Sequence, residues 1–369
     1  LDVTVQAQIL ELISELRAQL NTSVLLITHD LGVVAGHCDR VLVMEQGERR
    51  DYGSVDQVFQ DPSHAYTQKL LAAVPRIDAP GRQGALPGGD TLLQVDGLSV
   101  QFRLPADRWL APRRQLTAVD QVSFELGPGE SLGVVGESGC GKSTLARAVL
   151  RLVKAHAGRV SLLGRELLPL KGKDLRMARR DLQVVFQDPL ASLDPRMSVR
   201  DIIAEPLESF SPELGREETT RRVARLLERV GLEPAHLNRY PHEFSGGQSQ
   251  RIGIARALIC EPQLVICDEA VSALDVSVQA QILDLLLDLQ KELGLALVFI
   301  AHDLAVVRQI SHRVLVMYLG RAVELAPADR LYEQPQHPYT RALLEAVPIP
   351  EPELERGRSR RLLGGDVPS

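Results

Sequence analysis

The chain has 369 residues, of which 44% are hydrophobic and 24% charged, so it can form about two globular domains with ordinary cores. Its formal net charge of −6 disfavours a protein that acts mainly on nucleic acid, because such proteins usually carry a basic excess. The four cysteines include no CxxC pair, so neither a disulfide scaffold nor a zinc ribbon is expected. No apolar run reaches the roughly 18 residues of a membrane span, so a membrane-spanning chain is not expected either.

The first segment of the chain recurs near its end. Residues 1–75 align without a gap with residues 274–348, and 34 of the 75 positions are identical. For two unrelated sequences of average composition, roughly one aligned position in sixteen would be identical by chance. A repeat this long indicates duplicated domains, since solenoid units run to only 20–50 residues. We therefore expect residues 1–78 to be the C-terminal part of a domain whose head is absent, and a first residue other than Met fits a chain that starts inside that domain.

The residues between and after the copies differ in composition from both. Residues 79–91 are rich in Pro and Gly and lack apolar periodicity, which predicts a linker. Residues 349–369 are rich in Pro and Arg, and we expect a poorly ordered tail there. The domain that these segments flank is residues 92–348.

Strands and helices alternate along residues 92–348. The patterns predict half-buried strands at 92–102 and 119–126, buried strands at 131–136, 182–187, 263–269, 296–302 and 313–320, and helices at 142–153, 219–230 and 276–293. This alternation predicts an α/β fold with a mainly parallel sheet that is covered on both faces.

The run GESGCGKS at 136–143 fits the phosphate-binding pattern GxxxxGK[ST], and it stands between a predicted strand and a predicted helix. Glycines let backbone N–H groups face phosphates, and the helix N-terminus adds partial positive charge. Lys142 would reach the β- and γ-phosphates of ATP and Ser143 would ligate Mg²⁺. The alternative is a Gly-rich turn before a helix. The predicted nucleotide-binding residues are Gly136, Glu137, Ser138, Gly139, Cys140, Gly141, Lys142, Ser143 and Thr144.

Two further motifs follow downstream. The buried strand LVIC ends in Asp268 and Glu269, of which the first suits Mg²⁺ and the second suits the orientation of an attacking water. An exposed acidic loop is the alternative. The run SGGQ at 245–248 precedes an apolar helix and is either a second anion site or a plain helix cap.

The ordered set GESGCGKST, VVFQDP, FSGGQSQR, LVICDEA, SALD and FIAHD resembles the ATPase subunit of ATP-binding-cassette (ABC) transporters. The region around HPYTRALLEAVP resembles the C-terminal extension of the dipeptide, oligopeptide and nickel importer subfamily, and the two copies resemble its fused two-cassette ATPases. The resemblance implies a P-loop NTPase cassette with a mainly parallel core sheet, an antiparallel β subdomain and an α-helical signature subdomain.

The resemblance also implies roles for single residues. Gln187 matches the Q-loop glutamine, which senses the γ-phosphate and Mg²⁺, and His302 matches the switch histidine. Asp275 matches the D-loop and Phe102 an adenine-stacking aromatic, for which a core position is the alternative. Ser245, Gly246, Gly247 and Gln248 match the signature that closes over the ATP of the opposite domain. Asp2 and His29 are the counterparts of Asp275 and His302 in the first copy.

The function that the resemblance implies is ATP hydrolysis coupled to the import of dipeptides, oligopeptides, glutathione or a related solute. Its cofactors would be ATP and Mg²⁺. Its partners would be membrane permease subunits, a periplasmic or lipoprotein solute-binding protein and a second ABC ATPase domain, with no nucleic acid. Its place would be the cytoplasmic face of the bacterial inner membrane. The alternatives are a soluble translation-factor type of ABC ATPase and an inactive regulatory fragment.

The first copy carries no phosphate loop, carboxylate pair or signature. We therefore expect an ATP site with a signature to form only when residues 92–348 of two molecules pair. This pairing predicts slow ATPase activity that depends on protein concentration.

Overall fold

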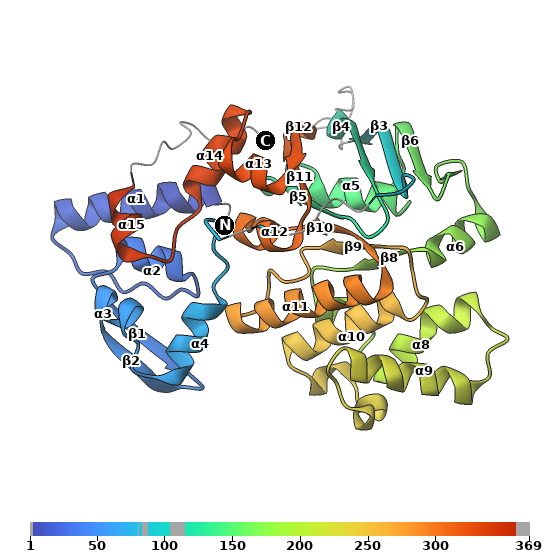
Figure 1. Cartoon of the computed structure of the whole chain (residues 1–369), viewed down its shortest axis with the longest axis horizontal. Helices are drawn as coiled ribbons and strands as arrows, with labels where there is room; N and C mark the ends of the chain where they lie inside the picture. Colours follow the sequence, from blue (N-terminus) through green and yellow to red (C-terminus); the bar gives the residue numbers. More distant parts are fainter. Residues whose placement is uncertain (1–2, 80, 83–87, 104–114, 359–369) are drawn as a thin grey trace, which may run out of the picture.

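The computed structural model describes residues 3–79, 81–82, 88–103 and 115–358 (Figure 1). Its centre is a six-stranded sheet with the order β12-β11-β5-β10-β9-β8. The strands are β5 (Ser131–Val135), β8 (Leu182–Val185), β9 (Leu264–Asp268), β10 (Ala296–Ile300), β11 (Arg313–Tyr318) and β12 (Arg321–Pro327). All neighbours are parallel except β11 and β12. Every residue of β5, β9 and β10 is buried, as expected for a sheet covered on both faces.

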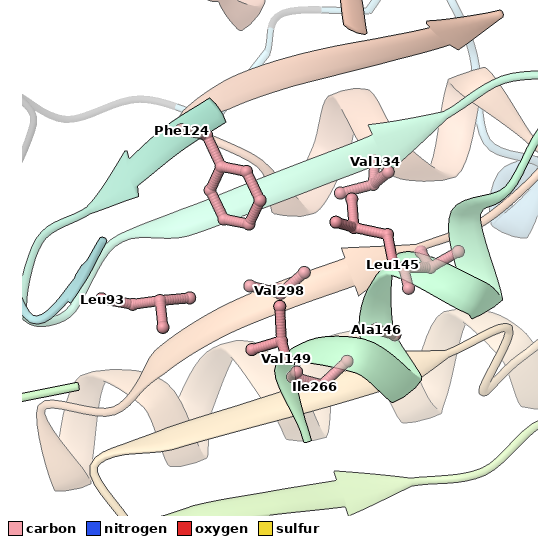
Figure 2. A pocket seen from close by; sticks show the side chains of 9 residues that line it. Leu93, Phe124, Val134, Leu145, Ala146, Val149, Ile266 and Val298 are labelled. Carbon is pink, nitrogen blue, oxygen red and sulfur yellow. The ribbon is translucent and has the colours of Figure 1, made fainter. Parts of the chain in front are cut away.

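Residues 92–348 also form an antiparallel sheet, in which the strand order is β4-β3-β6-β7. Its strands are β3 (Leu93–Arg103), β4 (Gln115–Leu126), β6 (Ala157–Leu162) and β7 (Arg165–Glu166). Helix α5 (Lys142–Val149) is packed between this sheet and the central one. Figure 2 shows Leu145 and Val149 of α5 pointing toward Val298 of β10 and Phe124 of β4. The gap among them is about 10 Å³ and lined only by apolar side chains, so it is a packing void and not a ligand site.

Helices cover the other face of the central sheet. They are α7 (Pro189–Ser192), α8 (Val199–Phe210), α9 (Arg216–Arg229), α10 (Gly246–Leu258) and α11 (Val276–Leu293), with short 3₁₀ turns at Pro234–Asn238 and Pro241–Glu243. Helix α6 (Gly172–Arg180) lies beside β8 instead, with Ala178 in the apolar core that contains α5. Helices α8, α9 and α10 pack on one another and share one apolar core with α11 and the sheet. The sequence therefore predicted the mainly parallel sheet, the antiparallel subdomain and the helical subdomain correctly. It placed the end of α5 four residues too late.

Helices at the C-terminal end complete the second half of the chain. They are α12 (Leu304–Ile310), α13 (Ala328–Glu333), α14 (Pro338–Ala346) and α15 (Pro352–Gly357). We expected residues 349–369 to be poorly ordered, but residues 352–357 of this segment form α15, which packs on the first copy of the repeat. Its buried Glu355 lies against Gly36 of α2. Residues 359–369 lie outside the described part of the chain.

The first copy of the repeat folds into α1 (Val3–Leu20), α2 (Leu31–His37), β1 (Arg40–Glu45), β2 (Glu48–Ser54), α3 (Val55–Gln60) and α4 (Ala65–Ala73). Each of these elements has the same bounds as α11, α12, β11, β12, α13 and α14 once 273 is added to its residue numbers. The two copies therefore adopt one local structure at all of these elements.

One strand of the second copy has no equivalent in the first. Residues 22–28 align with the region around β10 but form no strand. Leu25 and Ile27 are 89% and 90% exposed, whereas their equivalents Val298 and Ile300 are 4% and 1% exposed. Strand β10 is hydrogen-bonded between β5 and β9, and no described strand flanks residues 22–28 in that way. A β-strand needs these neighbours, so the same sequence pattern gives a mostly solvent-facing segment without strand structure.

The described part of the linker contacts the domain of residues 92–348. Arg82 donates hydrogen bonds to Ser131 Oγ at 2.9 Å and to the carbonyl of Ile310 at 3.0 Å. None of the described helices is both long and apolar enough to cross a membrane.

Candidate nucleotide site

The phosphate loop, residues 136–143, joins β5 to α5 in a conformation that only glycine permits at two positions. Gly136 and Gly141 have φ values of 147° and 105°. A Cβ on Gly136 would overlap the carbonyl of Met317, and one on Gly141 would overlap the carbonyl of Ala118. Main-chain atoms of neighbouring strands thus fix both ends of the loop. The loop ends where α5 begins, so the helix N-terminus faces the loop interior.

Lys142 lies inside this loop. Its side chain is only 4% exposed, and its ammonium donates hydrogen bonds to the carbonyls of Gly136 at 2.7 Å and Glu137 at 3.0 Å. The charge is therefore held at the centre of the loop, where a bound phosphate would meet it.

Ser143 and Asp268 meet at the edge of the loop. The Ser143 hydroxyl donates to Asp268 Oδ1 at 2.8 Å, and Asp268 closes the buried strand β9. Burial raises the pKa of Asp268, while the hydrogen bond from Ser143 opposes this rise. One carboxylate and one hydroxyl are hard oxygen donors of the kind that Mg²⁺ takes alongside substrate phosphates. The two residues fit the metal that the motif predicts.

Three strand ends converge on Glu269. Its carboxylate accepts a hydrogen bond from Gln187 Nε2 at 2.7 Å, and Gln187 follows β8. His302, which follows β10, places Nδ1 3.9 Å from Glu269 Oε1. The carboxyl ends of parallel strands form one edge of the sheet, and this edge brings the three predicted residues together.

The backbone of Glu269 is unusual. Its φ is 50°, a left-handed conformation that few residues other than glycine adopt, and its N–H donates to the carbonyl of Ile300 at 3.0 Å. Such strain is common at catalytic positions and persists only where surrounding contacts enforce it.

The run at 245–248 forms the start of α10. Ser245 accepts from the N–H of Gln248 at 3.3 Å, and Gln248 Oε1 accepts from the N–H of Ser245 at 3.0 Å, which makes a reciprocal capping box. A Cβ on Gly247 would overlap Val278 of α11, so this glycine permits close helix packing. Ser245 and Gly246 are exposed at the helix start. The helix-cap interpretation therefore holds, and it leaves the exposed N-terminus open to an anion.

The remaining predicted residues lie as follows. Asp275 caps α11 by accepting from the N–H of Val278 at 3.0 Å. Phe102 stands near the end of β3 and is 38% exposed. Ser138 and Gly139 are exposed in the phosphate loop, Cys140 is buried there, and Thr144 is half-buried in α5. His29 is exposed in the first copy, and Asp2 lies outside the described residues.

Two residues that lie beside the phosphate loop were not predicted from the sequence. The Tyr339 hydroxyl accepts a hydrogen bond from the N–H of Glu137 at 3.1 Å, and Thr4 donates to the Glu137 carboxylate. Tyr339 belongs to the HPYT run, whose recurrence as HAYT was a signal that the sequence offered. No sequence pattern marks Thr4, because its contact with Glu137 depends on how the two copies pack.

Two family models match the chain. The ABC transporter family matches residues 119–272, and the oligopeptide/dipeptide transporter C-terminal region matches residues 51–96 and 323–369. The second model thus matches twice, each time over the C-terminal end of one copy of the repeat and the residues that follow it.

Among curated proteins, the chain is 52% identical to the glutathione import ATP-binding protein GsiA of Salmonella typhimurium strain LT2 and 50% identical to that of Pectobacterium atrosepticum. Each alignment covers all of this chain and 63% of the relative. The chain therefore spans less than two thirds of the length of these proteins.

Among solved structures, the ATP-binding cassette MJ0796 in a dimeric post-hydrolysis state bound to ADP and Pi has a TM-score of 0.58 at 26% identity, over 64% of this chain and 98% of that one. The cassette cbiO1 of Clostridium perfringens has a TM-score of 0.57 at 27% identity, over 67% of this chain and 92% of that one. Motifs, geometry, fold and matches agree, and the chain belongs to the ABC transporter ATPases that carry the oligopeptide/dipeptide transporter C-terminal region.

Proposed function

We propose that the chain binds and hydrolyses ATP as the motor of an importer for glutathione or a related small peptide. The observation that carries the proposal is the convergence of Gln187 and His302 on the Glu269 carboxylate beside the Ser143–Asp268 pair. The relatives' name, glutathione import ATP-binding protein, supplies the solute class. The match to the oligopeptide/dipeptide transporter region supports the same class.

In this proposal the domain boundaries are those expected from the sequence. Residues 92–348 form an ABC ATPase domain, residues 1–78 correspond to the C-terminal part of another, residues 79–91 link them, and residues 349–369 follow as a tail. The partners are membrane permease subunits, a solute-binding protein and a second ATPase domain. The chain works as a peripheral subunit at the cytoplasmic face of the bacterial inner membrane.

The residues of the site have different roles in phosphoryl transfer. The phosphate loop and Lys142 would hold the phosphates, and Ser143, Asp268 and Gln187 would hold Mg²⁺. When bound, Mg²⁺ neutralises charge on the phosphate oxygens. Glu269 accepts a hydrogen bond from the attacking water and orients it, while Gln187 and His302 keep the carboxylate in place. Catalysis then comes from positioning and charge, as is usual for this reaction.

The other predicted residues serve the closed state. Phe102 offers an exposed ring on which adenine can stack. Ser245, Gly246, Gly247 and Gln248 face the ATP of the opposite domain, and Asp275 joins that interface through the helix it caps. The exposed start of α10 supports this role.

Substitution of Glu269 by Gln tests the site. The amide keeps the shape of the side chain but cannot act as a base. We expect Glu269→Gln to bind ATP like the parent chain and to hydrolyse it at least about 10²-fold more slowly. Ser143→Ala should instead weaken the dependence of ATP binding on Mg²⁺. An unchanged hydrolysis rate in Glu269→Gln, measured as released phosphate, contradicts the assignment.

The solute is tested in vesicles that hold the permease with its solute-binding protein. We expect ATP-driven uptake of labelled glutathione when the full protein is present, and none with Glu269→Gln. Uptake of a plain dipeptide in place of glutathione would keep the import function and change the solute.

A further inference from the structure

The HPYT run at 337–340 has no role in the proposed mechanism, yet the structure places it against the phosphate loop. The run begins α14, and His337 caps that helix by accepting a hydrogen bond from the N–H of Tyr339 at 3.2 Å. Glu324 of β12 accepts hydrogen bonds from the N–H groups of Gln336 at 2.9 Å and His337 at 3.0 Å. The start of α14 is therefore fixed on β12, and this fixes the backbone from which the Tyr339 side chain extends.

The Tyr339 side chain is buried beside the phosphate loop. Its ring lies with its centroid 4.3 Å from that of Tyr318, the last residue of β11. A ring packed in this way has little freedom to turn. Its hydroxyl reaches the main chain of the loop and accepts a hydrogen bond from the N–H of Glu137 at 3.1 Å.

The peptide unit between Gly136 and Glu137 is bonded on both of its sides. Its N–H donates to the Tyr339 hydroxyl, and its carbonyl accepts from the Lys142 ammonium at 2.7 Å. A peptide unit is planar, so its N–H and its carbonyl can only turn together. Loss of the tyrosine hydroxyl frees the unit to rotate, and that rotation moves the carbonyl that holds the Lys142 ammonium.

Other contacts hold the loop without fixing this peptide unit. A Cβ on Gly136 would overlap the carbonyl of Met317, which limits how closely the loop can approach β11. The N–H of Gly320 donates to the carbonyl of Cys140 at 2.9 Å, further along the loop. Both contacts act on other atoms, so they leave the orientation of the 136–137 unit to Tyr339 and Lys142.

We propose that Tyr339 is a positioning residue for ATP binding, whose hydroxyl sets the place of the Lys142 ammonium through the 136–137 peptide unit. The inference rests on the proposed ATPase function and deepens it. It gives the oligopeptide/dipeptide transporter C-terminal region, which matches residues 323–369, a role at the phosphate loop. Lys142 would meet the phosphates before and during the reaction alike, so its misplacement weakens ATP binding more than it slows the hydrolysis of bound ATP.

The first experiment separates binding from chemistry. Tyr339→Phe removes the hydroxyl and keeps the ring. We expect the KM for ATP to rise about 2- to 10-fold, as for the loss of one hydrogen bond, while kcat stays within about 2-fold of the parent. Tyr318→Phe removes a hydroxyl from the neighbouring ring and is the matched control, for which we expect neither change. A lower kcat at an unchanged KM means that Tyr339→Phe has only reduced the amount of folded protein, and it overturns the inference.

The second experiment asks whether Tyr339 acts through Lys142. Binding of ATP is titrated in the Lys142→Ala chain with and without Tyr339→Phe. We expect the added substitution to change the Kd for ATP less than about 2-fold, because the ammonium that the tyrosine positions is gone. The same fold-change in the parent and in the Lys142→Ala chain would show that the two residues act independently, and it overturns the inference.

The third experiment needs no ATP. Amide exchange is followed by NMR in the nucleotide-free parent and in Tyr339→Phe. We expect the Glu137 amide to exchange at least about 10-fold faster in the variant. The Leu145 amide, which donates to the carbonyl of Gly141 at 2.8 Å, should keep its rate and shows that α5 is intact. Unchanged exchange at Glu137 overturns the inference. Faster exchange at Glu137 in a chain that does not bind ATP supports the contact and counts against the proposed function alone.

Discussion

At the phosphate loop, two glycines have no room for a side chain, whereas a third has room to spare. Gly141 is left-handed and pressed against the carbonyl of Ala118, while Gly139 has a φ of 78° with no atom within 4 Å of its would-be Cβ. Comparison of Gly141 with Gly139 separates backbone strain from steric overlap, because a side chain at Gly141 would suffer both and one at Gly139 only the strain.

The change Gly141→Ala should therefore cost much more stability than Gly139→Ala. A left-handed alanine costs about 1–2 kcal/mol, which we expect for Gly139→Ala. Gly141→Ala adds the displacement of a strand carbonyl, so we expect a loss of at least about 3 kcal/mol. Urea unfolding followed by circular dichroism at 222 nm measures both. Equal losses at the two positions would contradict this account of the loop.

Site residues that belong to local sequence motifs could be predicted from the sequence. Residues that reach the site only through packing between distant segments could not. Lys142, Ser143 and Asp268 belong to local patterns, and the structure brings the last two together at 2.8 Å. Thr4 lies 133 residues from Glu137 and contacts it only because the two copies dock. The left-handed backbone of Glu269 was equally hidden, since it depends on a contact with Ile300 in another strand.

At the level of elements, the repeat shows how one sequence pattern folds in two different structural surroundings. Residues 22–28 and the region around β10 share an apolar pattern, yet only the second forms a strand. Periodicity therefore identified the buried strands correctly only where their neighbours exist. The same reasoning explains α15, which composition alone could not predict because its order comes from packing on α2 and α3.

Matched substitutions in the two copies should differ sharply in their effect. Val298→Asp places a charge in a fully enclosed strand, whereas Leu25→Asp places one at an equivalent position that is 89% exposed. We expect Val298→Asp to lose at least about 3 kcal/mol and Leu25→Asp to stay within about 0.5 kcal/mol of the parent. Thermal unfolding and the yield of folded protein measure the contrast. A comparable loss from Leu25→Asp would mean that residues 22–28 are buried in solution.

At the scale of the whole molecule, the linker meets the domain of residues 92–348 at a polar cluster, on the edge of the central sheet opposite the nucleotide site. Arg82 donates to Ser131 and to Gln290, and Gln290 donates in turn to the carbonyl of Gly129. His312 Nδ1 accepts from the N–H of Ser131 at 2.9 Å, which requires an unprotonated nitrogen. The residues that join the two copies thus share one cluster with a titratable group.

This cluster makes stability depend on pH. Burial, and after it the charge of Arg82, lower the pKa of His312 from 6.5 to about 4, and the charge of Glu130 opposes both effects. Because the pKa is lower in the folded chain than in the unfolded one, the unfolded chain binds more protons between these values. The stabilising contribution is therefore complete above pH 6.5 and is lost as pH falls toward 4.

We expect the parent chain to lose stability steadily between pH 6.5 and 4.5, and His312→Gln to lose less over the same interval. Urea unfolding at pH 7.5, 6.5, 5.5 and 4.5 gives the two slopes, and carboxylates elsewhere contribute equally to both chains. Arg82→Gln should lie between them, because it removes one cause of the low pKa and leaves burial in place. Identical slopes for the parent and His312→Gln would show that the histidine is already charged, or exposed, in the folded chain.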